Sequence, residues 1–164
     1  MTTKEITTVD PTTYNFKHCV GVQKRFDDLD PFAHINNCAQ QAYFDIGRAD
    51  YLGRLQKGNF FLADKAFLVV SYKTDFVRQI TFEVPLEVCT SVYHVGNKSI
   101  RIIQVLRNSQ SGEIHTTCDS VMAAVDIKQQ KSIEVPQIWR DAIATLEAWD
   151  EIPKDFSKLY LKCF

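Results

Sequence analysis

The first half of the chain changes from an alternating pattern to a helical one. From His18 to Phe26 hydrophobic and polar residues alternate, which predicts a strand with one buried face. After Asn37 the apolar spacing becomes three and four residues, which predicts one long helix ending at Gly58-Asn59. Gly47 and Gly53 lie inside this helix, and we expect both to permit close packing against a sheet. The residues expected on the buried face are Cys38, Ala42, Ile46 (or Asp45), Ala49, Leu52 and Leu55.

The second half, from Lys65 to Ile127, has the pattern of consecutive strands. Ala66–Val70 is a continuous apolar run, predicted to be buried on both faces at its centre. The Gly96-Asn97 pair between two alternating runs predicts a hairpin. Pro136 then opens a second helix. One face of that helix is expected to hold Trp139, Ile143 (or Ala142), Leu146 and Trp149.

This order of elements predicts an α+β fold, with one long helix facing an antiparallel sheet and a terminal helix after it. The 164 residues suit a single domain, assigned to residues 16–150. Residues 1–15 are interpreted as a flexible lead-in, and residues 151–164 as a tail that docks on the body or on a neighbouring subunit. No GxGxxG or GxxxxGK[ST] motif is present, which excludes those forms of dinucleotide and P-loop chemistry.

Composition excludes several other classes. The net charge is −1 and the basic residues are scattered, so no nucleic-acid partner is expected. No apolar run approaches the ~18 residues of a membrane span, and the first residues do not resemble a signal peptide. Five widely separated cysteines favour reduced thiols in a cytoplasmic protein. The four histidines lack metal-ligand spacing, so neither a metal nor an organic cofactor is expected.

The stretch from Phe26 to Arg48 carries the candidate chemistry. It turns tightly at Asp30-Pro31 and enters the long helix near Asn36-Asn37, so Asp30 and His34 lie just before a helix N-terminus. Such a terminus has unpaired backbone N–H groups and a partial positive charge. A carboxylate facing these amides is suited to attack on a carbonyl that the amides polarise.

This stretch resembles the 4-hydroxybenzoyl-CoA thioesterase-like family of hotdog-fold acyl-CoA thioesterases, whose pattern is approximately D-x-D-x-x-G-H-V-N-N followed by E-x-x-R. Here the pattern reads Asp28-Leu-Asp-Pro-Phe-Ala-His-Ile-Asn-Asn37, followed by Asp45 and Arg48. The resemblance implies an antiparallel sheet of five or six strands wrapped around the central helix. It also implies a homodimer or homotetramer that binds acyl-CoA between subunits.

The resemblance also assigns roles to individual residues. Asp30 is implied to be the nucleophile or general base, the backbone amide of Asn37 to polarise the carbonyl, and His34 to assist catalysis. Arg48 is implied to hold the helix against the loop. The residues expected to bind substrate are Asn36, Phe32, Tyr43, Lys98 and Ser99. Phe44 is also expected near the acyl group.

Each of these residues also has a structural interpretation. Asp30 is typical of turns, and Asn36 or Asn37 is typical of a helix N-cap. His34 could simply hold the loop, and Lys98 could be an ordinary exposed hairpin residue. The sequence also departs from the family pattern, because Ala33 replaces the motif glycine and Gln40 replaces a usual aromatic residue.

The leading hypothesis is therefore an enzyme that hydrolyses acyl-CoA or acyl-carrier-protein thioesters. One alternative is a non-catalytic hotdog protein that binds acyl-CoA to sense or carry it. Another is an enoyl-CoA hydratase with Asp30 and His34 as the acid/base pair, although the longer hydratase motif is not evident.

Overall fold

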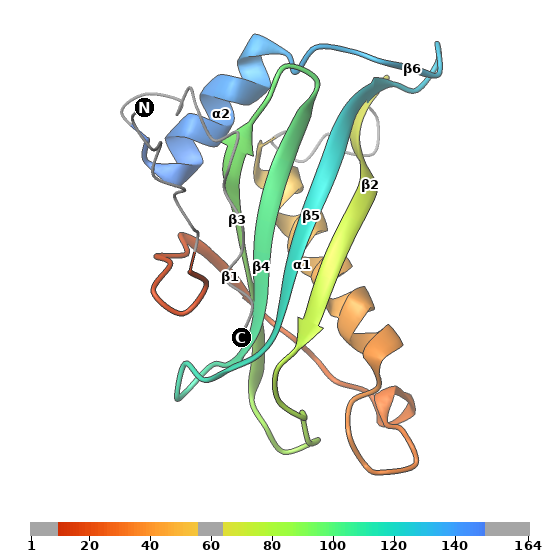
Figure 1. Cartoon of the computed structure of the whole chain (residues 1–164), viewed down its shortest axis with the longest axis vertical. Coiled ribbons are helices and arrows are strands. Elements are labelled where there is room, and N and C mark those ends of the chain that lie inside the picture. The colour runs from red at the N-terminus through yellow and green to blue at the C-terminus, as the bar shows by residue number, and fades with distance from the viewer. Residues whose placement is uncertain (1–9, 56–63, 150–164) are drawn as a thin grey trace, which may run out of the picture.

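A computed structural model describes residues 10–55 and 64–149 of the chain. A long helix, α1, lies against an antiparallel sheet, and a shorter helix, α2, follows near the C-terminal end (Figure 1). The elements are β1 (His18–Gly21), α1 (Asn37–Leu55), β2 (Lys65–Phe76), β3 (Leu86–Val95), β4 (Ser99–Asn108), β5 (Ile114–Asp126), β6 (Lys131–Ser132) and α2 (Gln137–Glu147), with a 3-10 turn at Phe26–Asp28. None of these helices is both long and apolar enough to cross a membrane.

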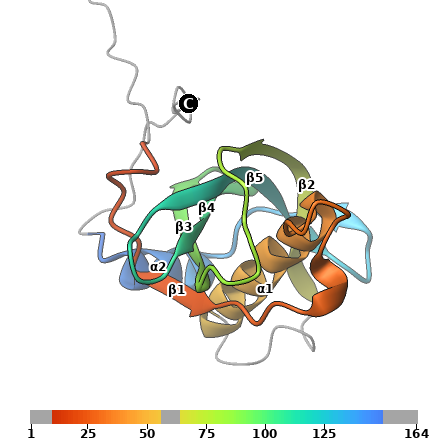
Figure 2. The same ribbon diagram turned by 90° about the horizontal axis from the view of Figure 1, so that it is seen from below.

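The sheet order is β1-β3-β4-β5-β2, with the short β6 paired to β5. Figure 2 shows the sheet curving around α1. The predicted α+β class is thus confirmed, including the six antiparallel strands, the central helix and the C-terminal helix. The predicted helix end at Gly58-Asn59 and the tail from residue 151 lie outside the described residues.

The prediction for the buried face of α1 was confirmed for Leu52, which is buried, and for Leu55, which packs against the core, but it was wrong for the rest of the helix. Four members of the expected apolar stripe, Cys38, Ala42, Ile46 and Ala49, are exposed. The face that meets the sheet consists instead of Ala39, Gln40, Tyr43, Phe44, Gly47, Arg48, Tyr51 and Leu52. The expected face was chosen by hydrophobicity, whereas the observed one buries polar side chains that have partners in the sheet.

Arg48 shows how a charged residue can lie on this buried face. Its guanidinium donates to Asp45 and, at 2.7 Å, to the Oε1 atom of Gln104 in β4. The Nε2 atom of Gln104 donates in turn to the carbonyl of Phe44 and to Thr90. Arg48 therefore holds α1 against the sheet rather than against the preceding loop, and its polar atoms are compensated within the core.

The strand predicted from His18 to Phe26 is shorter than expected. β1 ends at Gly21, and Phe26 lies in the 3-10 turn, where it is 81 % exposed instead of buried. The turn is fixed by Asp28, whose carboxylate accepts a hydrogen bond from the backbone N–H of Arg25 at 2.7 Å. The alternating pattern therefore continues in the sequence beyond the point where the chain leaves the sheet.

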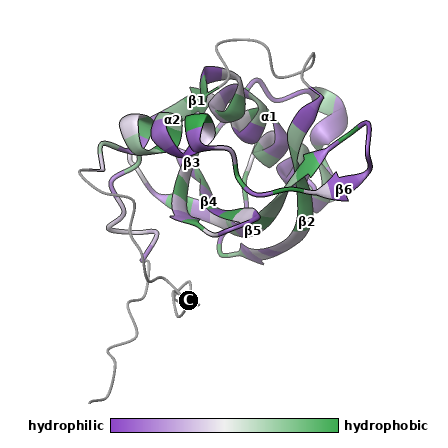
Figure 3. Cartoon of the chain, turned by 90° about the horizontal axis from the view of Figure 1, so that it is seen from above, coloured by the Kyte–Doolittle hydropathy of each residue, from purple (hydrophilic) through white to green (hydrophobic). Residues whose placement is uncertain are grey.

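The apolar run of β2 is also placed differently from the prediction. β2 is an edge strand, and Leu68 and Val70 are 51 % and 61 % exposed instead of buried. Tyr72 and Phe76, further along β2, are also exposed. In Figure 3 hydrophobic residues colour much of this strand. An exposed apolar edge strand is unusual in a monomer, because its free N–H and C=O groups favour pairing with another chain.

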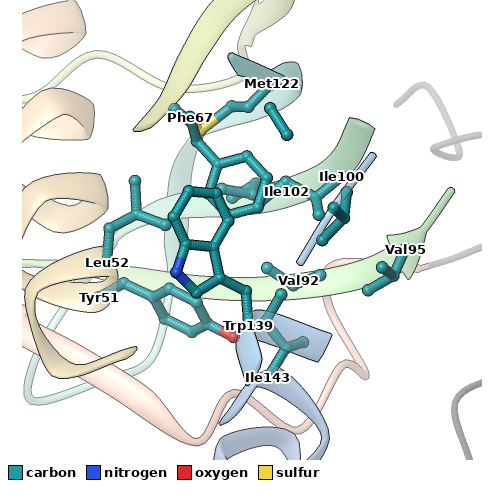
Figure 4. Packing of buried hydrophobic residues seen from close by; sticks show 12 residues of the cluster. Tyr51, Leu52, Phe67, Val92, Val95, Ile100, Ile102, Met122, Trp139 and Ile143 are labelled. Atoms are coloured by element: carbon teal, nitrogen blue, oxygen red, sulfur yellow. The ribbon is translucent and has the colours of Figure 1, made fainter. Parts of the chain in front are cut away.

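The predicted face of α2 is confirmed. Trp139 and Ile143 are buried against α1 and the sheet, and the ring centroids of Trp139 and Phe67 are 4.6 Å apart (Figure 4).

A buried carboxylate holds the C-terminal end of α2 against the sheet. Glu147 accepts hydrogen bonds from Tyr51, from Ser91 at 2.7 Å and from the N–H of Val92 at 3.0 Å. Burial raises the pKa of Glu147 despite these three donors.

The cysteines differ from expectation. Cys19 in β1 and Cys89 in β3 are directly paired in the register and are joined by a disulfide. The expectation of reduced thiols is therefore wrong for this pair. Cys38 and Cys118 are free, and Cys163 lies outside the described residues.

The two helix glycines have different environments. A Cβ atom at Gly47 would lie 2.8 Å from both Thr90 Oγ1 and Val88 Cγ2, whereas one at Gly53 would meet none of the described residues within 4 Å. The packing role predicted for both is thus confirmed for Gly47 and wrong for Gly53.

We expect Gly47→Ala to lower the free energy of unfolding by about 1–3 kcal/mol, because the added methyl group overpacks the helix–sheet contact. The matched variant Gly53→Ala should raise it by up to about 1 kcal/mol, because alanine favours the helix. Urea denaturation of both variants measures the difference. Equal effects at the two positions would contradict the close contact at Gly47.

Candidate active site

The loop before α1 is closed by its own backbone and by Asp30. The N–H of Asp30 donates to the carbonyl of His34 at 2.7 Å, and the N–H of Ala33 donates to the carbonyl of Asp30 at 3.0 Å. The Oδ1 atom of Asp30 accepts from the N–H groups of Phe32 and His34 at 2.9 and 3.0 Å. Through its Oδ1 atom, Asp30 therefore has the structural role in the turn that one interpretation of the sequence assigns to it.

Ala33 occupies a conformation that favours glycine. Its φ of 61° lies in the left-handed region, which costs a residue with a Cβ roughly 1 kcal/mol or more. This is the position where the resembling family has glycine. The loop keeps the backbone shape that glycine would adopt, and the hydrogen bonds of Asp30 help to offset the strain.

The start of α1 leaves backbone donors unpaired. Asn36 is the N-cap, because its Oδ1 atom accepts from the N–H of Ala39 at 2.7 Å. The next two N–H groups, those of Asn37 and Cys38, have no hydrogen-bond acceptor among the described residues. Both interpretations of the Asn-Asn pair therefore hold together: Asn36 caps the helix, and Asn37 offers a free amide.

These groups meet at one cleft of about 490 Å³. The loop and α1 form one wall, and the residues after the end of β2 form the other. The lining residues are Asp30, Phe32, His34, Ile35, Asn37, Gln40, Phe76, Val77, Arg78 and Gln79. The structure thus brings together the three predicted catalytic positions and Phe32. The Oδ2 atom of Asp30 has no hydrogen-bond partner within the described ranges, so it is available to a ligand.

Three polar residues of the cleft, Gln40, Arg78 and Gln79, were not identified from the sequence as site residues. Arg78 follows β2 and forms a half-exposed ion pair with Glu113, with Nε and Oε1 3.1 Å apart. Gln40 is buried, donates to the carbonyl of Ile35 at 2.9 Å and accepts from Thr116. Arg78 and Gln40 both reach the site through contacts with residues distant in the sequence. The one sequence feature that could have indicated Arg78 is its position as a cation directly after an apolar strand.

Four residues expected near substrate lie elsewhere. Tyr43 is buried beneath the loop, and Phe44 is fully buried in the core. Lys98 and Ser99 lie at the β3–β4 hairpin, at the opposite end of the sheet from the loop (Figure 1). Within one chain these four residues do not line the cleft, and neither does Asn36, which was also expected to bind substrate and instead caps the helix.

Tyr43 instead supports the loop through Asp28. Its hydroxyl donates to Asp28 Oδ2 at 2.6 Å, while the Asp28 carbonyl accepts from both the N–H and the Nδ2 of Asn36. Burial raises the pKa of Tyr43, and the neighbouring carboxylate raises it further. Burial alone would also raise the pKa of Asp28, but the hydrogen bonds from Tyr43 and Arg25 outweigh it and lower that pKa.

One group of potential metal ligands occurs in the part of the chain that the structure describes: Cys19, Glu87 and Cys89. The two sulfurs are joined in the disulfide, and Glu87 accepts from Arg107 at 2.7 Å. This group therefore offers no free thiolate to an ion, and it lies outside the cleft.

We expect Tyr43→Phe to lower the free energy of unfolding by about 1.5–3 kcal/mol at pH 7, because it removes a hydrogen bond to a buried carboxylate. The lowered pKa of Asp28 means that folding favours its ionised form. This stabilisation is present above the ordinary pKa of aspartate and is lost as the pH falls through the folded-state pKa.

The difference between wild type and Tyr43→Phe should therefore shrink in acid, measured by denaturation from pH 7 to pH 3. Ser132→Ala, which removes an exposed hydroxyl group, is the control and should have no effect. A penalty for Tyr43→Phe that is the same at every pH would contradict the proposed pairing.

Comparisons with known proteins agree with the fold. Residues 25–145 match the family model of the thioesterase-like superfamily. The chain is 28% identical over 132 residues to the uncharacterized protein YsmA of Bacillus subtilis, covering 79% of this chain and 83% of that protein.

Solved structures give the same result. The PA5185 protein of Pseudomonas aeruginosa superposes with a TM-score of 0.71 at 26% identity, covering 80% of this chain and 92% of that one. A thioesterase from Thermus thermophilus, solved with coenzyme A and Zn, gives a TM-score of 0.70 at 25% identity, covering 81% and 96%.

Proposed function

Because the chain belongs to the thioesterase-like superfamily, we propose that it hydrolyses an acyl-CoA or acyl-carrier-protein thioester to the free acid and the thiol. The observation that carries the proposal is the shared cleft of Asp30 and Asn37. Asp30 and Asn37 both line this cleft, and among the described residues neither the Oδ2 atom of Asp30 nor the N–H of Asn37 has a hydrogen-bond partner.

In this mechanism the thioester carbonyl oxygen accepts a hydrogen bond from the N–H of Asn37. That donor meets the negative charge that develops on the oxygen, which is typically worth about 3–4 kcal/mol in the transition state. Asp30 Oδ2 then either attacks the carbonyl carbon or removes a proton from an attacking water. In both routes the C–S bond breaks and the thiolate leaves. The first route forms an anhydride with Asp30, which water then hydrolyses to release the free acid and restore the carboxylate.

The two oxygens of Asp30 have different roles in this proposal. Oδ1 holds the loop through Phe32 and His34, so the carboxylate is oriented before substrate binds. His34 contributes its backbone to the same turn, and its side chain borders the cleft beside Phe32. Such preorganisation lowers the barrier, because the group need not be ordered during the reaction.

We expect Asp30→Asn to reduce kcat/KM by about 100-fold or more. Asparagine keeps an oxygen that can accept from Phe32 and His34, but it removes the negative charge. Release of free thiol from a panel of acyl-CoAs measures the loss. Asp27→Asn, at an exposed neighbouring aspartate, should leave the rate unchanged. Full activity of Asp30→Asn would exclude the proposed role of Asp30.

A non-catalytic acyl-CoA binder is the second candidate. It is favoured by the use of Asp30 Oδ1 as a structural acceptor, which would be sufficient reason for an aspartate here. This function predicts binding of acyl-CoA by calorimetry without release of CoA.

We also propose that two chains pair through β2. Its free edge, its exposed Leu68, Val70 and Tyr72, and the exposed apolar stripe of α1 together support such a homodimer, which could assemble further into a tetramer. Phe76 at the end of β2 borders the cleft, so this pairing would place the cleft near the subunit boundary.

Val70→Lys should shift the chain toward monomers, because it places a charge in the proposed contact. Analytical ultracentrifugation measures the change. Ile138→Lys, which alters a 73 % exposed residue on α2, should leave the oligomeric state unchanged. A monomeric wild-type chain would contradict the proposed pairing.

A further inference from the structure

A second cleft lies beside the candidate active site and has no part in the chemistry proposed above. It has a volume of about 360 Å³. Its lining residues, here named the aromatic groove, are Phe26, Leu29, Phe32, Ala33, His34, Thr81, Phe82 and Glu83. Phe32 and His34 border both clefts, so the two spaces are adjacent across one loop.

The aromatic groove contains three exposed phenylalanine rings that are not part of the hydrophobic core. Phe26, Phe32 and Phe82 are 81 %, 78 % and 41 % exposed. Three phenylalanines gathered in one concave surface present an apolar area that water solvates poorly. Such exposed apolar surfaces commonly mark binding sites, particularly when polar groups rim them.

Charged residues line the two clefts differently. Arg78 and the carboxylate of Asp30 line the first cleft, whereas Glu83 lines the aromatic groove without a lysine or arginine among the lining residues. Hydrogen bonds from the backbone of Glu83 itself and from Thr81 lower the pKa of Glu83, so it is anionic at neutral pH. The amine of Lys24 lies 5.8 Å from the centroid of the Phe82 ring, donates to the carbonyl of Val84 and interacts electrostatically with Glu83.

The positions of Arg78 and Glu83 orient a thioester whose thiol portion, such as CoA, carries phosphate groups. The phosphates of CoA or of a carrier-protein prosthetic group are attracted by Arg78 and repelled by Glu83. With the carbonyl at Asp30 and Asn37, the other half of the substrate is then directed past Phe32 and His34 into the aromatic groove.

We propose that the aromatic groove binds the acyl group and selects large, uncharged apolar or aromatic acyl chains over short ones. The proposal rests on the proposed thioesterase function for the reaction itself. It adds the position of the acyl group and the residues that determine its size, Phe26 and Phe82. Glu83 further disfavours acyl groups that end in a carboxylate.

The test compares two substrates in each variant. In wild type, kcat/KM should be higher for octanoyl-CoA than for acetyl-CoA. Phe26→Ala and Phe82→Ala should each lower the ratio of octanoyl-CoA to acetyl-CoA kcat/KM by about tenfold or more, because burial of a chain against a phenylalanine is lost. Ile138→Ala, at an exposed residue of α2, is the matched control and should leave the ratio unchanged.

A Glu83→Gln variant tests the charge at the rim. It should raise kcat/KM for glutaryl-CoA several-fold relative to pentanoyl-CoA, which has the same chain length without the terminal carboxylate. An unchanged octanoyl-to-acetyl ratio in both phenylalanine variants would overturn the proposal. Equal losses on both substrates would also overturn it, because they indicate a distorted active site and not a lost acyl contact.

A binding experiment separates this proposal from the proposed function. The thioethers S-octyl-CoA and S-ethyl-CoA cannot be hydrolysed, and calorimetry measures their affinity whether or not the chain is an enzyme. Phe26→Ala and Phe82→Ala should weaken S-octyl-CoA binding about tenfold or more and S-ethyl-CoA binding much less. Equal affinities of wild type for the two thioethers would overturn the groove assignment even if thioesters are hydrolysed. A shift of either variant toward monomers would assign the aromatic rings to subunit contact and would likewise overturn it.

Discussion

The candidate site depends on the hydrogen bonds that tie Asp28 to the first turns of α1. Its carbonyl accepts two hydrogen bonds from Asn36, and its carboxylate accepts from Tyr43, about two turns further along the helix. These contacts fix where the chain enters the helix. Because Asn36 is thereby held as the N-cap, the amide of Asn37 remains without a partner and borders the cleft. Without Asp28 the loop would have no fixed relation to the helix that supplies its amides.

The same loop shows how a residue can have a structural role and a chemical one together. Asp30 lines the cleft and uses one carboxylate oxygen to hold a turn in which Ala33 is strained, while the other oxygen has no hydrogen-bond partner among the described residues. Strain of this kind persists only where surrounding contacts over-determine the backbone. The choice between a turn residue and a reacting group is thus not exclusive, because each role uses a different atom.

The sequence was sufficient for the fold class, for the start of α1 and for the loop that lines the cleft, since these depend on local signals and on one sharp motif. It was misleading for the buried face of α1. Cys38, Ala42 and Ala49 have the composition of a core stripe, whereas Gln40 and Arg48 are buried because Thr116 and Gln104 supply their partners. Such partners are distant in the sequence, so no helical period can reveal them. Arg78 reached the cleft for the same reason.

The apolar residues that the structure leaves exposed share one physical explanation. A hydrophobic pattern shows that a residue is unfavourable in water, but it does not show whether the chain itself, a second chain or a ligand covers that residue. Leu68 and Val70 lie on an open strand edge, where backbone groups are available for pairing, so another strand suits them. Phe26 and Phe82 lie in a concave surface beside the candidate site with a carboxylate at its rim, and an apolar acyl chain suits that shape better than a strand does. Phe76 ends the exposed strand and borders the cleft, so the proposed association of subunits through this strand would lie next to the entrance of the site.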